Sequence, residues 1–98
     1  MAYKIEFHPE AEFEFDEALA WYNERRQGLE QEFYQEYLAA EMRIEANPYQ
    51  FPIVFGNTRR VNLYRFPYSV FFEIKQDSVF VTAIFHQKRN PGEWRGRV

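Results

Sequence analysis

The sequence predicts an α+β domain in which a helical hairpin packs on one face of a mainly antiparallel sheet, in the order β-α-α-β-β-β. Three observations lead to this fold class. Apolar residues alternate with charged ones at residues 3–7, recur at helical spacing between residues 9 and 46, and alternate again from residue 53 onward. With 98 residues and 46% hydrophobic content, residues 1–98 are expected to form a single domain with one core.

The chain is predicted to begin with a short half-buried strand, YKIEF at residues 3–7. His8-Pro9 then begins a helix, because proline suits the first helical turn, and this helix is expected to end near Arg26. Its apolar stripe is predicted from helical spacing, with four carboxylates outside it. The stripe comprises Ala11, Phe15, Ala18, Leu19 and Tyr22, and the carboxylates are Glu10, Glu14, Glu17 and Glu24.

A second helix is predicted from about Leu29 to Ala46, where apolar residues form one continuous stripe. The joint at Gln27-Gly28 is so short that the two helices are expected to form an antiparallel hairpin. Asn47-Pro48 ends the second helix, because the residue before a proline is pushed out of the α region.

The remaining elements are predicted to be strands. Residues 53–55 form either a short strand or an approach loop, and residues 59–66 form a strand with Val61 and Leu63 facing inward. Residues 68–75 and 78–86 are apolar on both faces and flank a two-residue turn, so they are expected to be the central hairpin. The second sheet face is expected to stay open, lined in part by Phe71, Phe80 and Ile84 or their opposite-parity neighbours, and rimmed by Arg59, Arg60, Arg65, Arg89 and Arg95.

Charge is divided unevenly along the chain. Residues 1–50 hold four Lys or Arg and twelve Asp or Glu, a net charge of −8, whereas residues 51–98 hold eight and three, a net charge of +5. The split indicates one of two things. Either the second half meets an anionic partner, an acidic protein or a nucleic acid, or the two halves attract each other within the fold.

Composition also narrows the classes of site. The chain has no cysteine, which excludes disulfides and thiolate zinc sites, and its two histidines alone make a weak metal site, so no metal or cofactor is expected. A reducing cytoplasm suits such a chain. No apolar run is long enough to span a bilayer and the first residues lack a signal-peptide pattern, so a soluble, cytoplasmic protein without a membrane partner is expected.

Five stretches of the chain, in this order and spacing, resemble the RelE/ParE superfamily of toxins from bacterial type II toxin–antitoxin modules, also called plasmid stabilisation proteins. The pair RFPY and H-x-x-R-x-P-x-x-W resembles the ParE-like branch in particular. The stretches are FHPEAEFEFDEALAWY, GLEQEFYQEY, IEANPYQFP, RRVNLYRFPYSVFFEI and VFVTAIFHQKRNPGEWRGR.

This resemblance implies a RelE/ParE-like fold, a cognate antitoxin, and one of two harmful activities. ParE-like members are associated with poisoning DNA gyrase, and RelE-like members cut messenger RNA on the ribosome. The resemblance favours a ParE-like toxin that acts on DNA gyrase by binding. The alternatives are a ribosome-dependent endoribonuclease and a non-toxic binding module of the same fold.

The nuclease pattern of RelE-like members is only partly matched. Arg60 and Arg89 keep expected cations, whereas Asn62 and Ser69 stand where further cations are expected. Trp94-Arg95 replaces the C-terminal tyrosine, and tryptophan cannot transfer a proton. If the protein is a nuclease, the candidate catalytic residues are His86, Arg89, Arg60 and Arg65. Histidine has an unperturbed pKa suited to acid–base chemistry, but the favoured role of His86 is to cap the strand end by bonding a backbone group.

The segment HQKRNPGEWRGR, residues 86–97, is predicted to leave the last strand as a basic and aromatic tail with a turn at Asn90-Pro91-Gly92. Trp94 either touches a partner or folds back and closes the core. Tyr68, in the FPY segment, is either a contact or a packing residue. The candidates for binding the target or the antitoxin are Arg59, Arg60, Arg65, Tyr68, Arg89, Trp94, Arg95 and Arg97.

Overall fold

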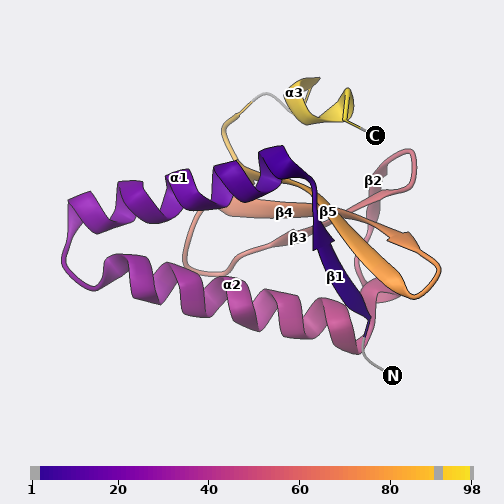
Figure 1. Cartoon of the computed structure of the whole chain (residues 1–98), viewed down its shortest axis with the longest axis horizontal. Coiled ribbons are helices and arrows are strands. Elements are labelled where there is room, and N and C mark those ends of the chain that lie inside the picture. The colour runs from indigo at the N-terminus through magenta and orange to yellow at the C-terminus, as the bar shows by residue number, and fades with distance from the viewer. Residues whose placement is uncertain (1–2, 90–91, 98) are drawn as a thin grey trace.

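A computed structural model describes residues 3–89 and 92–97 of the chain (Figure 1). Its elements follow the predicted order, with a short 3-10 helix, a strand at residues 53–55 and a C-terminal helix in addition. They are β1 (Lys4–Phe7), α1 (Pro9–Arg25), α2 (Leu29–Ala46), η1 (Pro48–Gln50), β2 (Ile53–Phe55), β3 (Thr58–Asn62), β4 (Tyr68–Lys75), β5 (Ser78–His86) and α3 (Gly92–Arg95). None of the helices in these described ranges is both long and apolar enough to cross a membrane.

The five strands form one sheet in the order β1-β5-β4-β3-β2. β1 runs parallel to β5, and the other neighbours are antiparallel, so the predicted α+β class with a mainly antiparallel sheet is confirmed. α1 and α2 run side by side as the predicted hairpin (Figure 1). Gly28, at φ +85°, makes the turn between them, a left-handed conformation that glycine adopts without strain.

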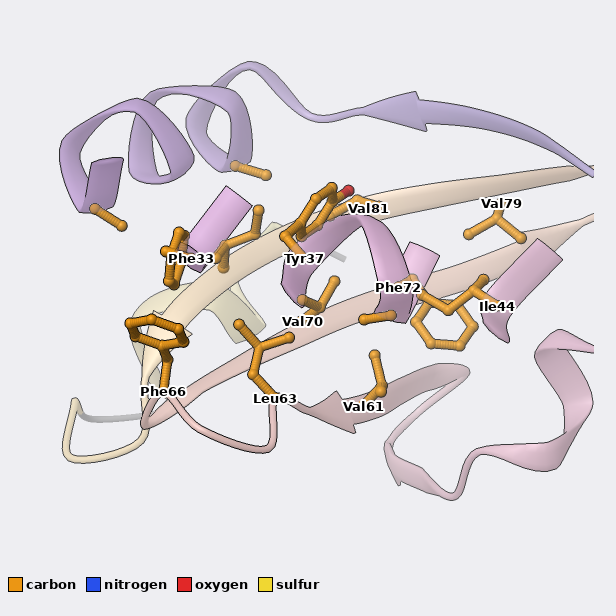
Figure 2. Close-up of a cluster of buried hydrophobic side chains, with 14 of the residues drawn as sticks. Phe33, Tyr37, Ile44, Val61, Leu63, Phe66, Val70, Phe72, Val79 and Val81 are labelled. Carbon is orange, nitrogen blue, oxygen red and sulfur yellow. The ribbon is translucent and has the colours of Figure 1, made fainter. Parts of the chain in front are cut away.

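The main core lies between the helical hairpin and one face of the sheet (Figure 2). Phe33 of α2 is fully buried there, with its ring 5.1 Å from that of Tyr22 in α1 and 5.2 Å from that of Phe66 in the loop after β3. Aromatic side chains bury large apolar areas, so these rings tie three segments into one cluster.

β3 is shorter than the sequence predicts. The predicted strand over residues 59–66 is wrong after Asn62, although Leu63 is buried in the main core as expected. The backbone turns away because the N–H of Arg65 donates to the Glu36 carboxylate of α2, at 2.6 Å, instead of to a neighbouring strand. Pro67 has no backbone N–H, so it cannot donate a hydrogen bond to a neighbouring strand.

The sequence predicted either a short strand or a loop at residues 53–55. The structure has a strand there, β2, which pairs with β3. Gly56 lies in the turn between them at φ +56°. The hairpin of β4 and β5 has the predicted bounds and the predicted turn at Gln76-Asp77. The predicted turn at Asn90-Pro91 lies outside the described residues.

β5 contains a bulge that the sequence did not predict. Phe71 of β4 pairs with Ala83 and Phe72 pairs with Val81, so Thr82 is an extra residue on β5. The Thr82 hydroxyl lies 3.3 Å from the carbonyl oxygen of Phe71 and donates a hydrogen bond to it.

Because of the bulge, the side chains of β5 after Thr82 point to the opposite sheet faces from those that strict alternation predicts. Val81 and Ile84 both lie in the main core, three positions apart, which strict alternation forbids. Phe71 lies instead in a second cluster with Ala83, Phe85 and Trp94. Phe71 is therefore on the second sheet face as predicted, whereas Ile84 faces the main core and its opposite-parity neighbour Phe85 lies on the second face.

The second sheet face is not open, which corrects a further expectation. α3 lies across it and places Trp94, 1% exposed, in the second cluster. The indole stacks on Phe71 with ring centroids 4.3 Å apart and meets Phe55 of β2 edge-on at 5.9 Å. The hairpin of α1 and α2 therefore covers one face of the sheet, and a single helical turn covers part of the other.

Candidate functional site

A pocket of about 380 Å³ remains beside Trp94 on the second face of the sheet, and we call it the basic pocket. Among the residues that the structure describes, no carboxylate lines it. It is lined by three arginines, Arg60, Arg89 and Arg95, by the polar residues Asn62, Ser69, His86 and Gln87, and by Val54, Phe71, Phe85 and Trp94.

The register of the sheet brings these residues together. Arg60 of β3 pairs with Phe71 of β4, and Asn62 pairs with Ser69 two positions along, so these side chains share one face. Ser69 in turn pairs with Phe85 of β5. The Ser69 hydroxyl and the Asn62 side-chain oxygen are 2.5 Å apart and form a hydrogen bond across the two strands.

The three arginines of the basic pocket differ in how they are held. Arg89 lies 3.8 Å from the centre of the Phe85 ring and bonds Glu93 of α3 at 2.7 Å. Arg95 lies over the Phe55 ring at 4.9 Å and is exposed. Arg60 is also exposed and makes no ion pair among the described residues.

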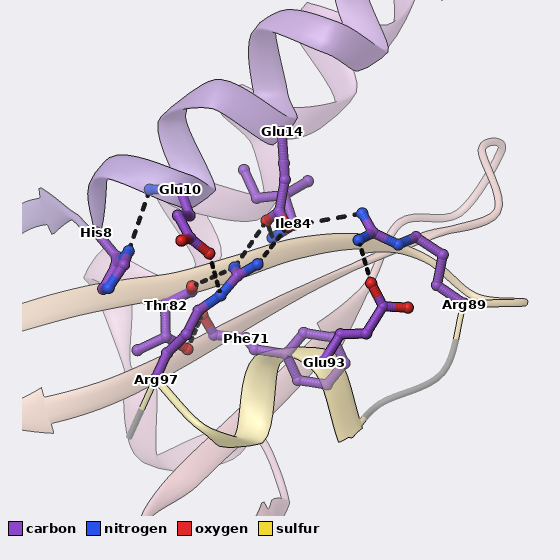
Figure 3. Close-up of polar contacts among 9 residues, drawn as sticks. All are labelled: His8, Glu10, Glu14, Phe71, Thr82, Ile84, Arg89, Glu93 and Arg97. Carbon is purple, nitrogen blue, oxygen red and sulfur yellow. Dashed lines mark hydrogen bonds and ion pairs between the residues drawn. The ribbon is translucent and has the colours of Figure 1, made fainter.

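Beside Arg89 lies a buried carboxylate, Glu14 of α1, which is 7% exposed (Figure 3). It accepts a hydrogen bond from the backbone N–H of Ile84, just after the bulge of β5, at 3.0 Å. The Arg97 guanidinium donates a hydrogen bond to each Glu14 carboxylate oxygen, at 2.8 and 3.1 Å, and the Arg89 guanidinium lies 3.6 Å from this carboxylate. Glu14 thus joins α1, β5 and the C-terminal segment.

Arg97 also reaches the bulge itself. Its guanidinium donates to the carbonyl oxygen of Thr82 at 3.1 Å and lies 2.9 Å from the Glu10 carboxylate. The hydrogen bond to Glu14 raises the pKa of Arg97 above its ordinary value, so the side chain stays charged. Arg97, with 11% of its side chain exposed, serves inside the fold and does not line the basic pocket.

His86 stands between the basic pocket and a larger pocket on the other side of β5. Its Nδ1 accepts a hydrogen bond from the backbone N–H of Lys88 at 3.1 Å, and its ring meets that of Tyr68 at 5.3 Å. The capping role that the sequence left open is therefore present in the structure. His8 has a similar role at the start of α1, where its Nδ1 accepts from the N–H of Glu10.

The larger pocket has a volume of about 620 Å³ and lies between α1 and the ends of β4 and β5. We call it the aromatic pocket. Trp21 on its wall is 48% exposed, whereas burial raises the pKa of Tyr68 on the opposite wall above the ordinary value. Its lining is Glu14, Glu17, Ala18, Trp21, Tyr22, Pro67, Tyr68, Ile84, His86 and Arg89.

Besides Arg97, two arginines from the candidate set line neither the basic nor the aromatic pocket. Arg59 donates to the backbone carbonyl of Phe51, at 2.7 Å, and so holds the loop before β2. Arg65 bonds the Glu32 carboxylate of α2 at 2.6 Å, on the hairpin side of the sheet. That hydrogen bond, with a second from Arg26, lowers the pKa of Glu32. Arg65 is therefore not brought together with His86, Arg89 and Arg60.

Glu14 is the residue that the sequence analysis missed. The helical pattern was assigned from apolar residues alone, which placed Glu14 outside the buried stripe. Its position, three residues after Ala11 and four before Ala18, is a signal that it faces the same way as these buried alanines. Within the described residues, no three His, Asp or Glu side chains gather as ligands for a metal ion.

Comparison with known proteins gives a family and a fold. The family model described as ParE toxin of type II toxin-antitoxin system, parDE, matches residues 5–91. A solved chain of the chromosomal ParDE toxin–antitoxin system from P. aeruginosa is 17% identical, with a TM-score of 0.72, over 87% of this chain and 96% of that one. A doubly substituted E. coli toxin RelE in the free state is 13% identical, with a TM-score of 0.61, over 100% and 99%. Comparison with curated proteins gave no match.

Proposed function

This chain belongs to the family of ParE toxins of type II toxin–antitoxin systems, and from that premise we propose that it stops bacterial growth by binding DNA gyrase and that a cognate antitoxin neutralises it. The proposed activity is binding and not RNA cleavage by the chain itself. The cytoplasm, where gyrase acts, is the proposed compartment.

The positions of three residues support the choice of binding over cleavage. RNA cleavage by attack of a 2′-OH needs a base, an acid and cations that converge on one phosphate. Of the four nuclease candidates, Arg65 bonds Glu32 on the hairpin side, and His86 has its Nδ1 engaged by a backbone N–H. Trp94, where a tyrosine would be expected, is buried against Phe71. These positions support a binding protein.

The experiment compares two consequences of expression in the same bacterial culture. The chain is expressed under tight control, with and without its antitoxin, and the DNA damage response and the integrity of messenger RNA are followed together. Damage induction with intact messages is the expected result. Messages cut within coding regions, without DNA damage, would establish the endoribonuclease alternative. Growth without either effect would establish a non-toxic binding module.

A supercoiling assay with purified gyrase tests the target directly. The protein should inhibit supercoiling or raise the level of cleaved DNA at concentrations that match those that stop growth. Unchanged supercoiling and unchanged cleavage at these concentrations would refute gyrase as the target. Addition of the antitoxin should restore supercoiling, which makes neutralisation and target engagement part of the same measurement.

For the antitoxin we propose the aromatic pocket as a docking site. Half-exposed tryptophans in pockets are frequent anchors of protein interfaces, and Trp21 is 48% exposed on the wall of this one. Disordered segments that fold on binding insert apolar side chains into such pockets. Glu17 on one wall and Arg89 on the other offer opposite charges to fix the direction of the bound segment.

Substitution of Trp21 tests this docking site. Trp21→Ala should weaken antitoxin binding by roughly 2 kcal/mol or more, as expected for an interface anchor. Met42→Ala is the matched control, since Met42 is 69% exposed on α2 and lines neither pocket. Equal antitoxin affinity for the two variants would show that the antitoxin does not dock in the aromatic pocket.

A further inference from the structure

The aromatic pocket has the size and the walls of a site for a small organic molecule. Its volume of about 620 Å³ lies within the range of roughly 300–1,000 Å³ that is usual for such sites. The rings of Trp21, Tyr22 and Tyr68 line it, together with the aliphatic side chains of Ala18 and Ile84. These apolar walls suit a short aliphatic chain.

The charges around the aromatic pocket leave one carboxylate for a ligand. Glu17 is exposed on α1 and makes no ion pair among the described residues. The other carboxylate of the lining, Glu14, already accepts two hydrogen bonds from Arg97. Arg89, which also lines the pocket, lies 3.6 Å from the Glu14 carboxylate and 2.7 Å from that of Glu93. A ligand that complements this pocket is therefore a cation that pairs with Glu17.

Glu17 lies close to the aromatic rings of the pocket. It is four residues before Trp21 on α1, so the two side chains share one face of the helix. Across the pocket, burial raises the pKa of Tyr68, the charge of Arg89 opposes this shift, and the charge of Glu17 adds to it. The effect of Glu17 on Tyr68 requires their side chains to be near each other. A cation beside Glu17 is thus within reach of both rings.

The chain already places a cation on one of these rings. The guanidinium of Arg25 lies 4.0 Å from the centre of the Trp21 ring. Tryptophan attracts cations more strongly than the other aromatic side chains, because the face of its ring carries negative charge density. Arg25 is exposed and makes no ion pair in the part of the chain that the structure describes, so no internal salt bridge is lost if a ligand displaces it.

We propose that the aromatic pocket binds a small aliphatic amine in its charged form, with the ammonium group paired with Glu17 and held against the rings of Trp21 and Tyr68. The carbon chain of the amine lies along Ala18 and Ile84. The ligand is a free small molecule that binds the toxin in the absence of its antitoxin. The inference goes beyond the proposed function, and it does not depend on gyrase as the target.

The test is a nuclear magnetic resonance titration of the isotope-labelled protein with n-butylammonium chloride at constant ionic strength. The indole N–H of Trp21 and the backbone N–H groups of Ala18 and Tyr68 should shift along one saturating curve. The indole N–H of Trp94, which is 1% exposed and stacked on Phe71, should not move. n-Butanol has the same chain without the charge, and it should bind roughly tenfold more weakly because it offers Glu17 no charged partner.

Glu17→Gln should weaken butylammonium binding roughly tenfold, because the substitution removes the charge and keeps the shape of the side chain. Glu24→Gln is the matched control. Glu24 is exposed on the same helix, lines neither the aromatic nor the basic pocket, and its substitution changes the net charge equally, so the affinity should stay unchanged. Trp21→Ala should weaken binding about threefold, the contribution of one exposed contact between a cation and an aromatic ring.

Thermal unfolding checks that each variant is folded, which is expected because all three substituted side chains are exposed. The proposal would be overturned by the absence of a saturating shift, or by equal affinities for butylammonium and n-butanol. Equal affinities of Glu17→Gln and Glu24→Gln would overturn it as well, because binding would then be a general effect of the acidic surface.

The outcome for the antitoxin can be told apart from this one. If Trp21→Ala and Met42→Ala bind the antitoxin equally while Trp21→Ala loses affinity for butylammonium, the antitoxin docking site is refuted and the amine site stands. Failure of gyrase inhibition with retained butylammonium binding would likewise refute the proposed target and leave this inference intact.

Discussion

Glu14 and Arg97 lie 83 residues apart in the sequence and form a two-pronged ion pair inside the fold, with nitrogen–oxygen distances of 2.8 and 3.1 Å (Figure 3). The pair fastens α1 to the segment that follows α3. Glu14 also binds the N–H of Ile84, and Arg97 binds the carbonyl of Thr82, so both ends of the bulge in β5 are held by this one pair.

Glu14→Gln should destabilise the protein by about 3 kcal/mol, because breaking the buried pair leaves Arg97 with only the exposed Glu10 carboxylate as a counter-charge. The free energy of unfolding in urea measures this loss. Glu17→Gln is the control, since Glu17 lies on the same helix, is exposed, and has no ion pair among the described residues. Similar stabilities for the two variants would mean that the pair contributes nothing.

Trp94→Ala should cost about 3–5 kcal/mol, the usual loss for a large aromatic side chain removed from a core. Trp94 is 1% exposed and stacks on Phe71. Trp21→Ala makes the same chemical change at a position that is 48% exposed, so it should cost about 1 kcal/mol or less. Thermal and urea unfolding measure the loss of stability in each of the two variants. A small loss at Trp94 would show that α3 does not hold the second sheet face.

Gln76→Asn should stabilise the protein by about 0.5 kcal/mol, because Gln76 has φ +58° in the turn between β4 and β5, and asparagine tolerates that conformation better. Gln31→Asn, on the exposed surface of α2, should act in the opposite direction, since asparagine is a weaker helix former. Differential scanning calorimetry measures whether each substitution raises or lowers the stability of the protein. A loss of stability at Gln76 would contradict the strain assigned to this turn.

Glu41→Gln should raise stability at neutral pH and change it little in acid. Burial, and then the charge of Glu45, raises the pKa of Glu41 above its ordinary value of 4.5, while a hydrogen bond with Tyr37 opposes the shift. A carboxyl whose pKa is raised on folding contributes stability below its unfolded pKa and loses it as the pH rises through the folded pKa. Unfolding curves of both proteins between acid and neutral pH should converge as the pH falls, and a gap that widens in acid would contradict this.

Arg65→Ala should leave growth arrest unchanged and change the stability little, because its partner Glu32 is at an exposed surface on the hairpin side. Arg60→Ala makes the same change within the basic pocket, and it should weaken growth arrest if that pocket meets the target. Growth curves after induction compare the two variants at matched protein levels. Loss of toxicity at Arg65 alone would place the contact with the target on the other side of the sheet.

Much of the fold could be predicted from the sequence because periodicity reports which way a side chain faces. The bounds of α2 and of the hairpin from β4 to β5 agree with the structure, and the family resemblance agrees with the matched family model. Local signals were sufficient there, since a proline or a two-residue joint marks all of these ends except that of β5.

The candidate site was only partly predicted, because its geometry depends on contacts between distant segments. The bulge at Thr82 has no local signal, since threonine suits a regular strand, yet it moves Ile84 to the other sheet face. Arg60 and Arg89 were predicted and do line one pocket, whereas Arg97 was taken for a surface cation and is in fact the partner of Glu14. A carboxylate at position 14 and an arginine at position 97 cannot be paired from one sequence.

The Glu14–Arg97 pair also bears on the speed of unfolding. Because the pair joins residues far apart in sequence and binds Ile84 and Thr82, we expect it to form only after the hairpin of β4 and β5. An interaction absent from the folding transition state slows unfolding without speeding folding. The pair is thus expected to prolong the time that each molecule stays folded, and with it the time that a toxin without its antitoxin persists.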